Sequence, residues 1–353
     1  MGADSAYYRA KDQAKRDNIK QIKKQLPQHT HGFIEECLLK YQINTTYSYV
    51  HDLYIFYKFI HETNPLCSDK TIREIPFEII GSLNASDINE FQNYLASSNE
   101  EEKKHGEKSR AISRKMSAIR CFFSYEERMD YLDHNPTLKA AKKQKEIENE
   151  IFRLDPDSVK QLICAVENVD VKSFHSKVLS ETTAKRDLAL IILLLDTGIR
   201  VSECAGIDLD DINFSTNTIK IVRKGGKATD IYINERTRNA LRDYINHERP
   251  ALLLDDKEPA LFISLKHTRL SVRSIQYMVE KYGKNLGLSG KLSPHKLRKT
   301  FGTALYNKTG DIYMVADVLG HKDVNTTVKH YAAMEEKHKQ LAAQIDIYDT
   351  SKE

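Results

Sequence analysis

The sequence lacks the features that mark secreted, membrane-spanning and metal-stapled proteins. It has no tryptophan, and its five cysteines are far apart with no Cys-x-x-Cys pair, which argues against disulfides and structural zinc. The longest apolar run, Leu188 to Leu195, is far shorter than the roughly 20 residues of a membrane span. No charged-then-apolar signal segment opens the chain. The sequence therefore predicts a cytoplasmic protein with no membrane and no metal.

The chain also has little excess of one charge over the other. The 353 residues carry 54 Lys+Arg against 50 Asp+Glu, a net charge of +4. The distribution is uneven, because the stretch from Lys103 to Arg120 holds seven basic residues and one acid. Such segregation can present a basic face to a polyanion. A solvated helix face explains the same pattern, and charge alone favours that explanation.

At about 150 residues per domain, the length predicts two domains. Composition and apolar spacing divide the chain into five segments: a polar N-terminal tail (1–28), a helical domain (29–138), a Lys- and Glu-rich linker (139–153), a second domain (154–335) and a C-terminal helix or tail (336–353).

Apolar spacing predicts a small helical bundle for the first domain. Apolar and aromatic residues recur at helical spacing from Phe33 to His61, and Asn64-Pro65 ends that run. Ser86-Asp87 is expected to cap a second helix. A third helix over 109–131 combines apolar and basic residues, so the bundle contains one basic helix.

The second domain combines helices with one strand pair. Residues 218–222 and 230–233 alternate in polarity, and Gly225-Gly226 between them is typical of a hairpin turn. Helical spacing predicts helices over 156–168, 186–197, 235–247, 271–286, 294–306, 311–319 and 324–332. The predicted fold class is mainly α with a small antiparallel β-sheet.

Six residues in five short motifs are candidates for an active site. They are Arg200 in DTGIRVSE, Lys224 in VRKGGK, His295 and Arg298 in SPHKLRKTFG, His321 in LGHKDVNTT and Tyr331 in KHYAAM. His295 and Arg298 are three residues apart and so share one helix face. In this order the six resemble the active site of the tyrosine recombinase family, which includes phage integrases, Xer recombinases and transposon integrases. The resemblance is strong over 154–335 and looser before it.

The resemblance implies an enzyme that cuts and rejoins DNA without metal, ATP or any other cofactor. Tyr331 would be the nucleophile that forms a covalent 3′-phosphotyrosine intermediate on the way to a Holliday junction. Arg200 and Arg298 would stabilise the charge that gathers on the phosphate oxygens, because guanidiniums are always ionised and donate paired hydrogen bonds. The implied fold is the tyrosine recombinase catalytic fold in a two-domain, C-shaped DNA clamp.

The remaining residues would transfer protons or hold the other side chains in place. Lys224, at the hairpin turn, would protonate the leaving 5′-oxygen, although Arg223 and Lys227 are close enough to compete. His295 would accept or orient the tyrosine proton, and His321 would donate to a phosphate oxygen. A supporting acid, Glu203, matches the family and would hold Arg200 or a histidine. One departure is Lys299, which stands where many relatives have a second histidine.

The first domain resembles the family's core-binding domain, a four-helix unit that forms half of the clamp. Its basic helix is expected in the major groove, with Lys115 and Arg120 as preferred contacts. The full set of candidate DNA-contact residues is Arg110, Arg114, Lys115, Arg120 and Arg273. Sequence alone does not separate base contacts, which discriminate, from phosphate contacts, which add salt-dependent affinity.

The resemblance also implies the partners. These are double-stranded DNA with paired recombination half-sites and further copies of the chain, as a dimer on one site and a tetramer in synapsis. An accessory protein, if there is one, is unknown. After Tyr331, a sparse apolar set in 336–353 is expected to dock into a neighbouring protomer, with folding back on its own domain as the alternative. Integration, excision and resolution all remain open as biological roles.

Two alternatives use the same residues differently. A type IB topoisomerase-like enzyme would relax supercoils as a monomer without a specific site. A catalytically silent architectural protein would bind DNA only, but decay normally removes a catalytic residue and all six are present. The sequence therefore favours the recombinase.

Overall fold

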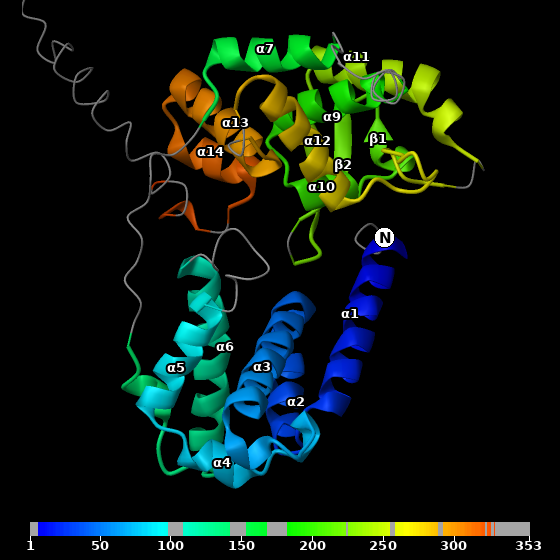
Figure 1. The fold of residues 1–353 in the computed structure, drawn as a ribbon. Helices are drawn as coiled ribbons and strands as arrows, with labels where there is room; N and C mark the ends of the chain where they lie inside the picture. The colour runs from blue at the N-terminus through cyan, green and yellow to red at the C-terminus, as the bar shows by residue number, and fades with distance from the viewer. Residues whose placement is uncertain are drawn as a thin grey trace, which may run out of the picture. The chain divides into compact units, whose positions relative to one another are not determined.

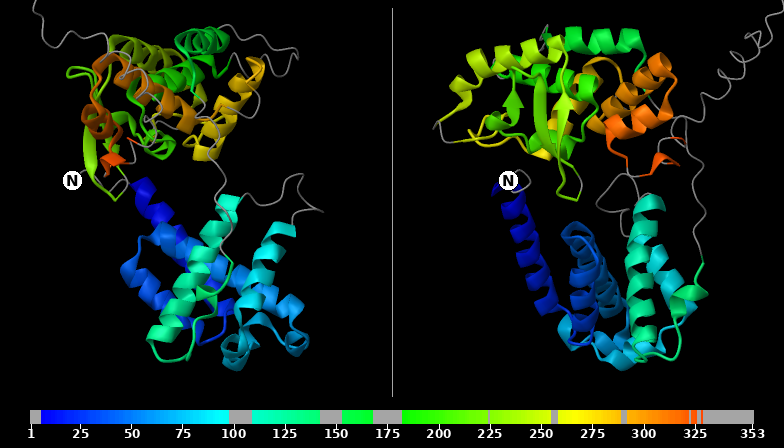
Figure 2. Two further views of the ribbon diagram at one scale, coloured as in Figure 1. Left: turned by 90° about the vertical axis from the view of Figure 1, so that its left-hand side faces the viewer. Right: turned by 180° about the vertical axis from the view of Figure 1, so that it is seen from behind.

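The structure, a computed structural model, describes residues 6–97, 109–141, 153–167, 182–223, 225–254, 258–288, 292–321, 323–325 and 328. The chain divides into two compact units, residues 4–148 and residues 149–353, each with its own apolar core. Both units are mainly helical, and the strands of the described residues all lie in the second (Figure 1, Figure 2). The predicted fold class is confirmed.

Residues 4–148 form a bundle around an aromatic core. Its helices are α1 (Ala6–Gln25), α2 (Thr30–Lys40), α3 (Ile43–Thr63), α4 (Phe77–Ser82), α5 (Ala85–Ser97) and α6 (Ser109–Arg128). The ring of Phe56 on α3 contacts Phe91 on α5 and Phe123 on α6 edge-on, with centroids 5.0 and 5.9 Å apart. These aromatic contacts hold α3, α5 and α6 together.

The structure differs from the sequence prediction at two places in this unit. Where a polar tail was expected, α1 packs against α3 and buries Ile19, and Leu26 just after it is buried too. A few apolar side chains on one face are enough to dock a helix that is polar elsewhere. The run expected as one helix from Phe33 is two, because Tyr41 and Gln42 are extended.

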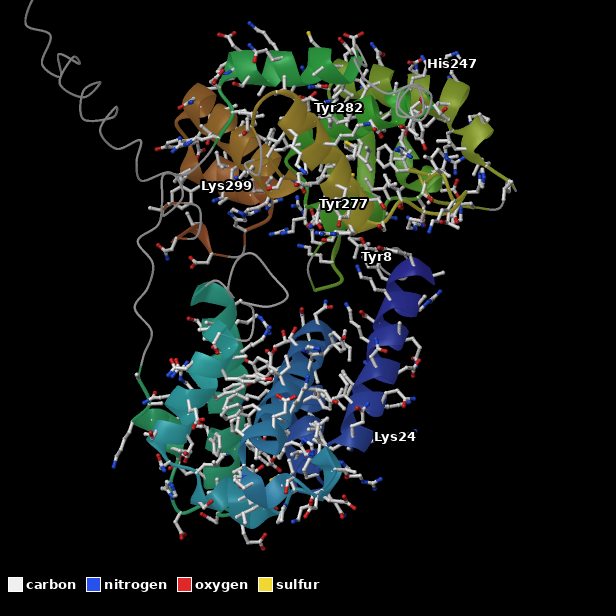
Figure 3. The ribbon with its side chains drawn as sticks, in the orientation of Figure 1. Tyr8, Lys24, His247, Tyr277, Tyr282 and Lys299 are labelled. Atoms are coloured by element: carbon white, nitrogen blue, oxygen red, sulfur yellow. The ribbon has the colours of Figure 1, made fainter. Side chains whose placement is uncertain are left out.

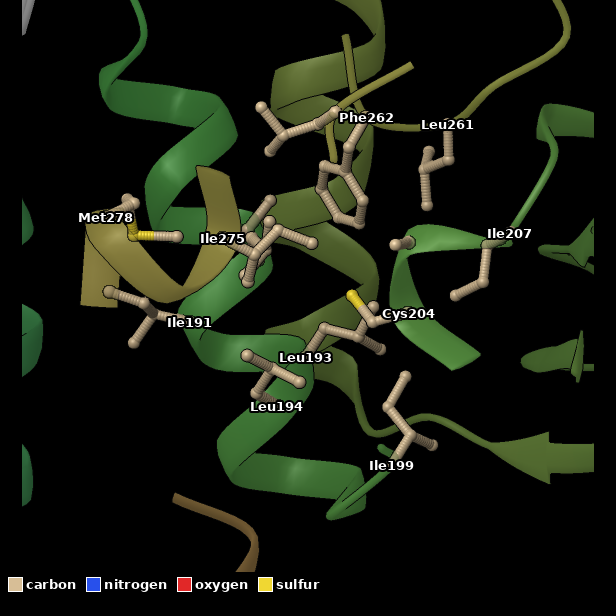
Figure 4. Packing of buried hydrophobic residues seen from close by; sticks show 14 of the residues in the cluster. Ile191, Leu193, Leu194, Ile199, Cys204, Ile207, Leu261, Phe262, Ile275 and Met278 are labelled. Carbon is tan, nitrogen blue, oxygen red and sulfur yellow. The ribbon is translucent and has the colours of Figure 1, made fainter. Parts of the chain in front are cut away.

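Residues 149–353 are built around one buried helix. The elements are α7 (Pro156–Glu167), α9 (Ala184–Thr197), α10 (Val201–Ala205), β1 (Ile212–Asn213), β2 (Thr218–Val222), β3 (Ala228–Tyr232), α11 (Glu235–Asp243), α12 (Val272–Asn285), α13 (Pro294–Thr309) and α14 (Ile312–Leu319). A π-helical turn, Tyr244–Glu248, follows α11. Because α9 is apolar over most of its length, ten of its 14 residues are buried, and Figure 4 shows part of this packing around Ile191, Leu193 and Leu194.

The sheet is antiparallel in the order β1-β2-β3. Val222 pairs with Ala228, and the turn beyond them is closed by Arg223, whose N–H donates to Lys227 O at 2.8 Å. Gly225 and Gly226 have φ of +99° and +81°, a conformation that glycine adopts without strain. The hairpin predicted from these glycines is confirmed, whereas the short β1 was not predicted.

Two further predictions fall largely outside the described residues. These are the helix over 324–332, of which only 324–325 and 328 are described, and the segment 336–353. Within the described residues, no helix combines the length and the apolar character needed to cross a bilayer.

Candidate active site

Arg200 is fixed by the abrupt end of α9. Gly198 ends that helix at φ +61°, and a Cβ at this position would lie 2.4 Å from the ring of Phe301. Arg200 then starts α10, where its N–H and its Nη1 each donate to one oxygen of Glu203 at 2.8 Å. The Glu203 side chain is 2% exposed, so a buried carboxylate orients the guanidinium through charge-assisted hydrogen bonds.

Arg298 approaches the same place from α13. Its Nη1 donates to Gly198 O at 2.6 Å, and its Nη2 donates to Leu319 O at the end of α14. The residue is only 4% exposed. A buried guanidinium held on backbone carbonyls keeps one orientation, which is what the stabilisation of a developing charge requires.

The carbonyls at the end of α14 receive a third arginine. Arg223 donates from Nη1 to Leu319 O at 2.9 Å and from Nη2 to Val318 O at 3.0 Å, while Arg200 Nη2 donates to Gly320 O at 3.2 Å. We name Val318, Leu319 and Gly320 the α14 terminal turn. The last carbonyls of a helix have no partner within the helix and carry its negative dipole end, so guanidiniums suit them. The α14 terminal turn thus gathers arginines from the α9–α10 junction, the β2–β3 hairpin and α13.

Burial has an electrostatic cost at Arg223. Its pKa is lowered, chiefly because burial disfavours the charged form and secondly because Arg200 is close by. Glu203 opposes this shift, with Oε2 lying 3.9 Å from Arg223 Nη1. One buried carboxylate therefore serves two guanidiniums.

Both candidate histidines line one pocket with Arg200 and Arg298. His295 is exposed in the first turn of α13, three residues before Arg298, and the half-buried His321 follows the α14 terminal turn, with its N–H on Ala316 O at 2.9 Å. The pocket is lined by Ile199, Arg200, Val201, Ser202, Pro294, His295, Arg298, Lys299, Leu319 and His321. Among the described residues, this lining contains cationic and imidazole groups and no acid, so it suits an anion such as a phosphate.

The structure brings together four of the six residues that the sequence singled out. The other two, Lys224 and Tyr331, lie outside the described residues. The sequence did not anticipate the place of Lys299 in the pocket lining (labelled in Figure 3) or the contacts of Arg223 with α14. The only signal for Arg223 was its position beside Lys224, because its partners lie about a hundred residues further along the chain.

The candidate DNA-contact residues of α6 lie in unequal surroundings. Arg110 belongs to the helix, although its side chain lies outside the described part. Arg114 pairs with the fully buried Asp52, its Nη2 lying 2.9 Å from Oδ1. Arg120 is half-buried.

The structure differs from the expectation most clearly at Lys115. This preferred contact is only 9% exposed. The physical reason is helical spacing, because Lys115 is three residues after Ile112 and four before Ile119 and so shares their inward face. The sequence predicted an exposed basic side chain at Lys115 on α6, whereas the structure buries this residue.

Arg273 occupies an exposed face of the second unit. Its guanidinium carbon lies 4.2 Å from the ring centroid of Tyr277 on α12, and Nη2 donates to Tyr277 Oη at 2.9 Å. Tyr277 is labelled in Figure 3 and is 56% exposed. The pair presents a stacked cation and an aromatic ring to solvent.

Comparisons with known proteins identify a family and several similar chains. Residues 153–338 match the phage integrase family. The tyrosine recombinase XerC of Caldanaerobacter subterraneus is 31% identical over 293 residues, 80% of this chain and 76% of that protein. The tyrosine recombinase XerS of Streptococcus pneumoniae is 26% identical over 350 residues, 91% of this chain and 97% of that protein.

A solved structure shares the fold. The crystal structure of the XerH site-specific recombinase bound to its palindromic difH substrate, a post-cleavage complex, matches with a TM-score of 0.60 at 18% identity. The match covers 85% of this chain and 79% of that one.

Proposed function

The chain belongs to the phage integrase family of tyrosine recombinases, and from this premise we propose that it is a site-specific DNA recombinase working through a covalent 3′-phosphotyrosine intermediate. The observation that supports this proposal is the pocket that Arg200, Arg298 and two histidines line together, with no acid among the described lining residues. The alternatives of a topoisomerase and a silent DNA-binding protein are not favoured, since the matched relatives are named as recombinases.

In the proposed cleavage step, the phenol oxygen of Tyr331 attacks the scissile phosphorus. The bond from phosphorus to the 5′-oxygen breaks, and the tyrosine is left esterified to the 3′-phosphate. His295 takes or orients the phenol proton, and Lys224 gives a proton to the departing 5′-oxygen. The step is reversible, because a 5′-hydroxyl from the partner strand can attack the phosphotyrosine and restore the phosphodiester.

The arginines and His321 would stabilise the transition state. The hydrogen bonds of Arg200 to Glu203 and Gly320 use two of the five donors of its guanidinium, so donors remain for a non-bridging oxygen. Arg298 would act beside it, and His321 would donate to the same phosphate. Glu203 would be a positioning residue that keeps Arg200 aimed at this place.

The proposal extends to the DNA and the assembly. The substrate would be double-stranded DNA with paired half-sites, bound as a dimer and joined as a tetramer in the cytoplasm. Arg110, Arg114, Arg120 and Arg273 remain candidate contacts, and so does Lys115, although only 9% of that residue is exposed. The segment 336–353 would join neighbouring protomers, during integration, excision or resolution.

The deciding experiment traps the covalent intermediate. The substrate is a nicked suicide duplex carrying the site that the protein selects from a randomised duplex pool. Wild-type protein should form an adduct that survives denaturing gels, and Tyr331→Phe should bind the same duplex without forming it. Tyr306→Phe, at a tyrosine outside the pocket lining, is the matched control and should form the adduct. An adduct in Tyr331→Phe would refute the nucleophile assignment.

A further inference from the structure

Arg223, the residue before the proposed general acid Lys224, is held by hydrogen bonds of both its backbone and its side chain. Arg223 follows β2, and its backbone closes the hairpin turn, since its N–H donates to Lys227 O at 2.8 Å and its carbonyl accepts from Gly226 N–H at 3.0 Å. Its side chain is 12% exposed and donates to two carbonyls of the α14 terminal turn. Residue 223 is therefore tied to the hairpin by its backbone and to α14 by its guanidinium.

We propose that Arg223 is a positioning residue, which anchors the β2–β3 turn on the α14 terminal turn and so sets where Lys224 presents its ammonium group. The inference rests on the proposed function, because it takes Lys224 as the general acid. Consecutive Cα atoms lie about 3.8 Å apart across a trans peptide, so fixing residue 223 limits where residue 224 starts. On the other side of Lys224, Gly225 and Gly226 have no side chain with which to hold the turn to α14.

The α14 side of this contact is shaped to receive the guanidinium. Gly320 has φ +62°, and a Cβ there would lie 2.6 Å from Arg223 Nη1 and 2.8 Å from its Cζ. The accepting carbonyls belong to the negative end of the helix, one turn before His321. The contact therefore joins the hairpin that carries Lys224 to the turn that carries His321.

The arrangement predicts a specific chemical signature. If Arg223 only places the acid, its loss should matter when the leaving group needs a proton and not when it leaves without one. Arg223→Ala should slow cleavage of an ordinary 5′-oxygen duplex about 10- to 100-fold, the scale expected for a misplaced catalytic group. On the same duplex with a 5′-bridging phosphorothiolate, whose thiolate leaves unprotonated, the variant should cleave within about threefold of wild type.

Three variants make the test selective. Lys224→Ala should show the same rescue by sulfur, and adding Arg223→Ala to it should cause no further loss on the oxygen duplex. Arg223→Lys, which keeps the charge and the aliphatic stem, should give a smaller loss with the same rescue and replaces the alanine variant if that does not fold. Arg249→Ala is the matched control, because Arg249 is also a buried arginine on backbone carbonyls but lies outside the pocket lining.

The outcomes separate the two levels of the argument. Equal slowing of both duplexes by Arg223→Ala, or no slowing of either, would overturn the positioning role while leaving Lys224 as the acid. The same sulfur rescue in Arg249→Ala would also overturn it, because the signature would then follow any loss of a buried arginine. If Lys224→Ala itself is not rescued, the assignment of the acid fails and the role of Arg223 fails with it.

Discussion

The two units of this chain bury carboxylates in opposite ways. In residues 149–353, Glu203 is 3% exposed and accepts two hydrogen bonds from Arg200, with Arg223 Nη1 at 3.9 Å. In residues 4–148, Glu126 is fully buried on α6, and neither of its oxygens has a hydrogen-bond partner in the described part of the chain. Burial raises the pKa of Glu126 to about 7.

The difference shows what a buried acid contributes in each place. Beside the pocket, the guanidiniums of Arg200 and Arg223 compensate the charge of the Glu203 carboxylate. The buried carboxylate in turn holds Arg200 in one orientation. In the helical bundle, no described residue compensates Glu126 in this way, and burial raises its pKa and so favours the neutral acid. The same residue type is thus a positioning group in one unit and a stability cost at high pH in the other.

The largest effect is expected for Glu203→Gln, which removes the charge of the buried carboxylate beside the pocket. Removing one charge from a buried pair typically costs about 3–5 kcal/mol, and a misaimed arginine costs about 100-fold in rate. Adduct formation on the suicide duplex should fall by that factor while DNA binding in a gel-shift assay persists. Glu235→Gln, at an exposed glutamate on α11, should change neither quantity. Normal cleavage by Glu203→Gln would remove it from the site.

The second prediction concerns pH. The pKa of Glu126 is about 7 when folded against 4.5 for the free side chain, so its contribution to stability is full below pH 4.5 and is lost as pH rises to 7. The loss amounts to about 3 kcal/mol at 1.36 kcal/mol per pKa unit. In urea unfolding, Glu126→Gln should therefore gain about that much over wild type at pH 8 and much less at pH 5.

The control for this titration is a position on the same helix with no ionisable side chain. Ser113 is exposed, and Ser113→Ala should differ from wild type by the same amount at both pH values. If the stability difference between Glu126→Gln and wild type is the same at pH 5 and pH 8, the carboxyl of Glu126 does not titrate on folding.

A smaller effect tests how closely the arginines fit the α14 terminal turn. Gly310 and Gly320 both have positive φ, +66° and +62°, but a Cβ at 310 has nothing within 4 Å whereas one at 320 meets Arg223. Gly310→Ala should cost about 1–2 kcal/mol, the usual penalty of the left-handed conformation. Gly320→Ala should cost more and also slow cleavage, as thermal unfolding and adduct yield would show. Equal behaviour of the two variants would mean that Arg223 adapts freely.

The smallest expected effect is at the surface of the first unit. If Arg120 contacts a phosphate, Arg120→Ala should weaken binding uniformly across sequences and reduce the slope of log K against log salt by about 1. Arg114→Ala should instead lower stability, because it leaves the fully buried Asp52 without its guanidinium. Binding titrations at several salt concentrations, together with urea unfolding, separate the two. An unchanged salt slope for Arg120→Ala would exclude it as a phosphate contact.

Much of the fold followed from local sequence. The apolar faces predicted α7, α9 and α12 to within a few residues, and the glycine pair predicted the hairpin, because periodicity and turn chemistry act over a few residues. The order of the six site residues is by itself enough to indicate the family. These features need only the residues themselves and their spacing.

Tertiary structure alone decided the rest. It packed α1 against α3 with Ile19 buried, turned Lys115 inward and buried Glu126 with no hydrogen-bond partner among the described residues. It also brought three arginines to the α14 terminal turn from positions 200, 223 and 298. The physical reason is that burial and hydrogen bonding at these sites depend on partners up to 120 residues away in the chain. The local spacing of residues does not predict which distant carbonyl or side chain lies nearby.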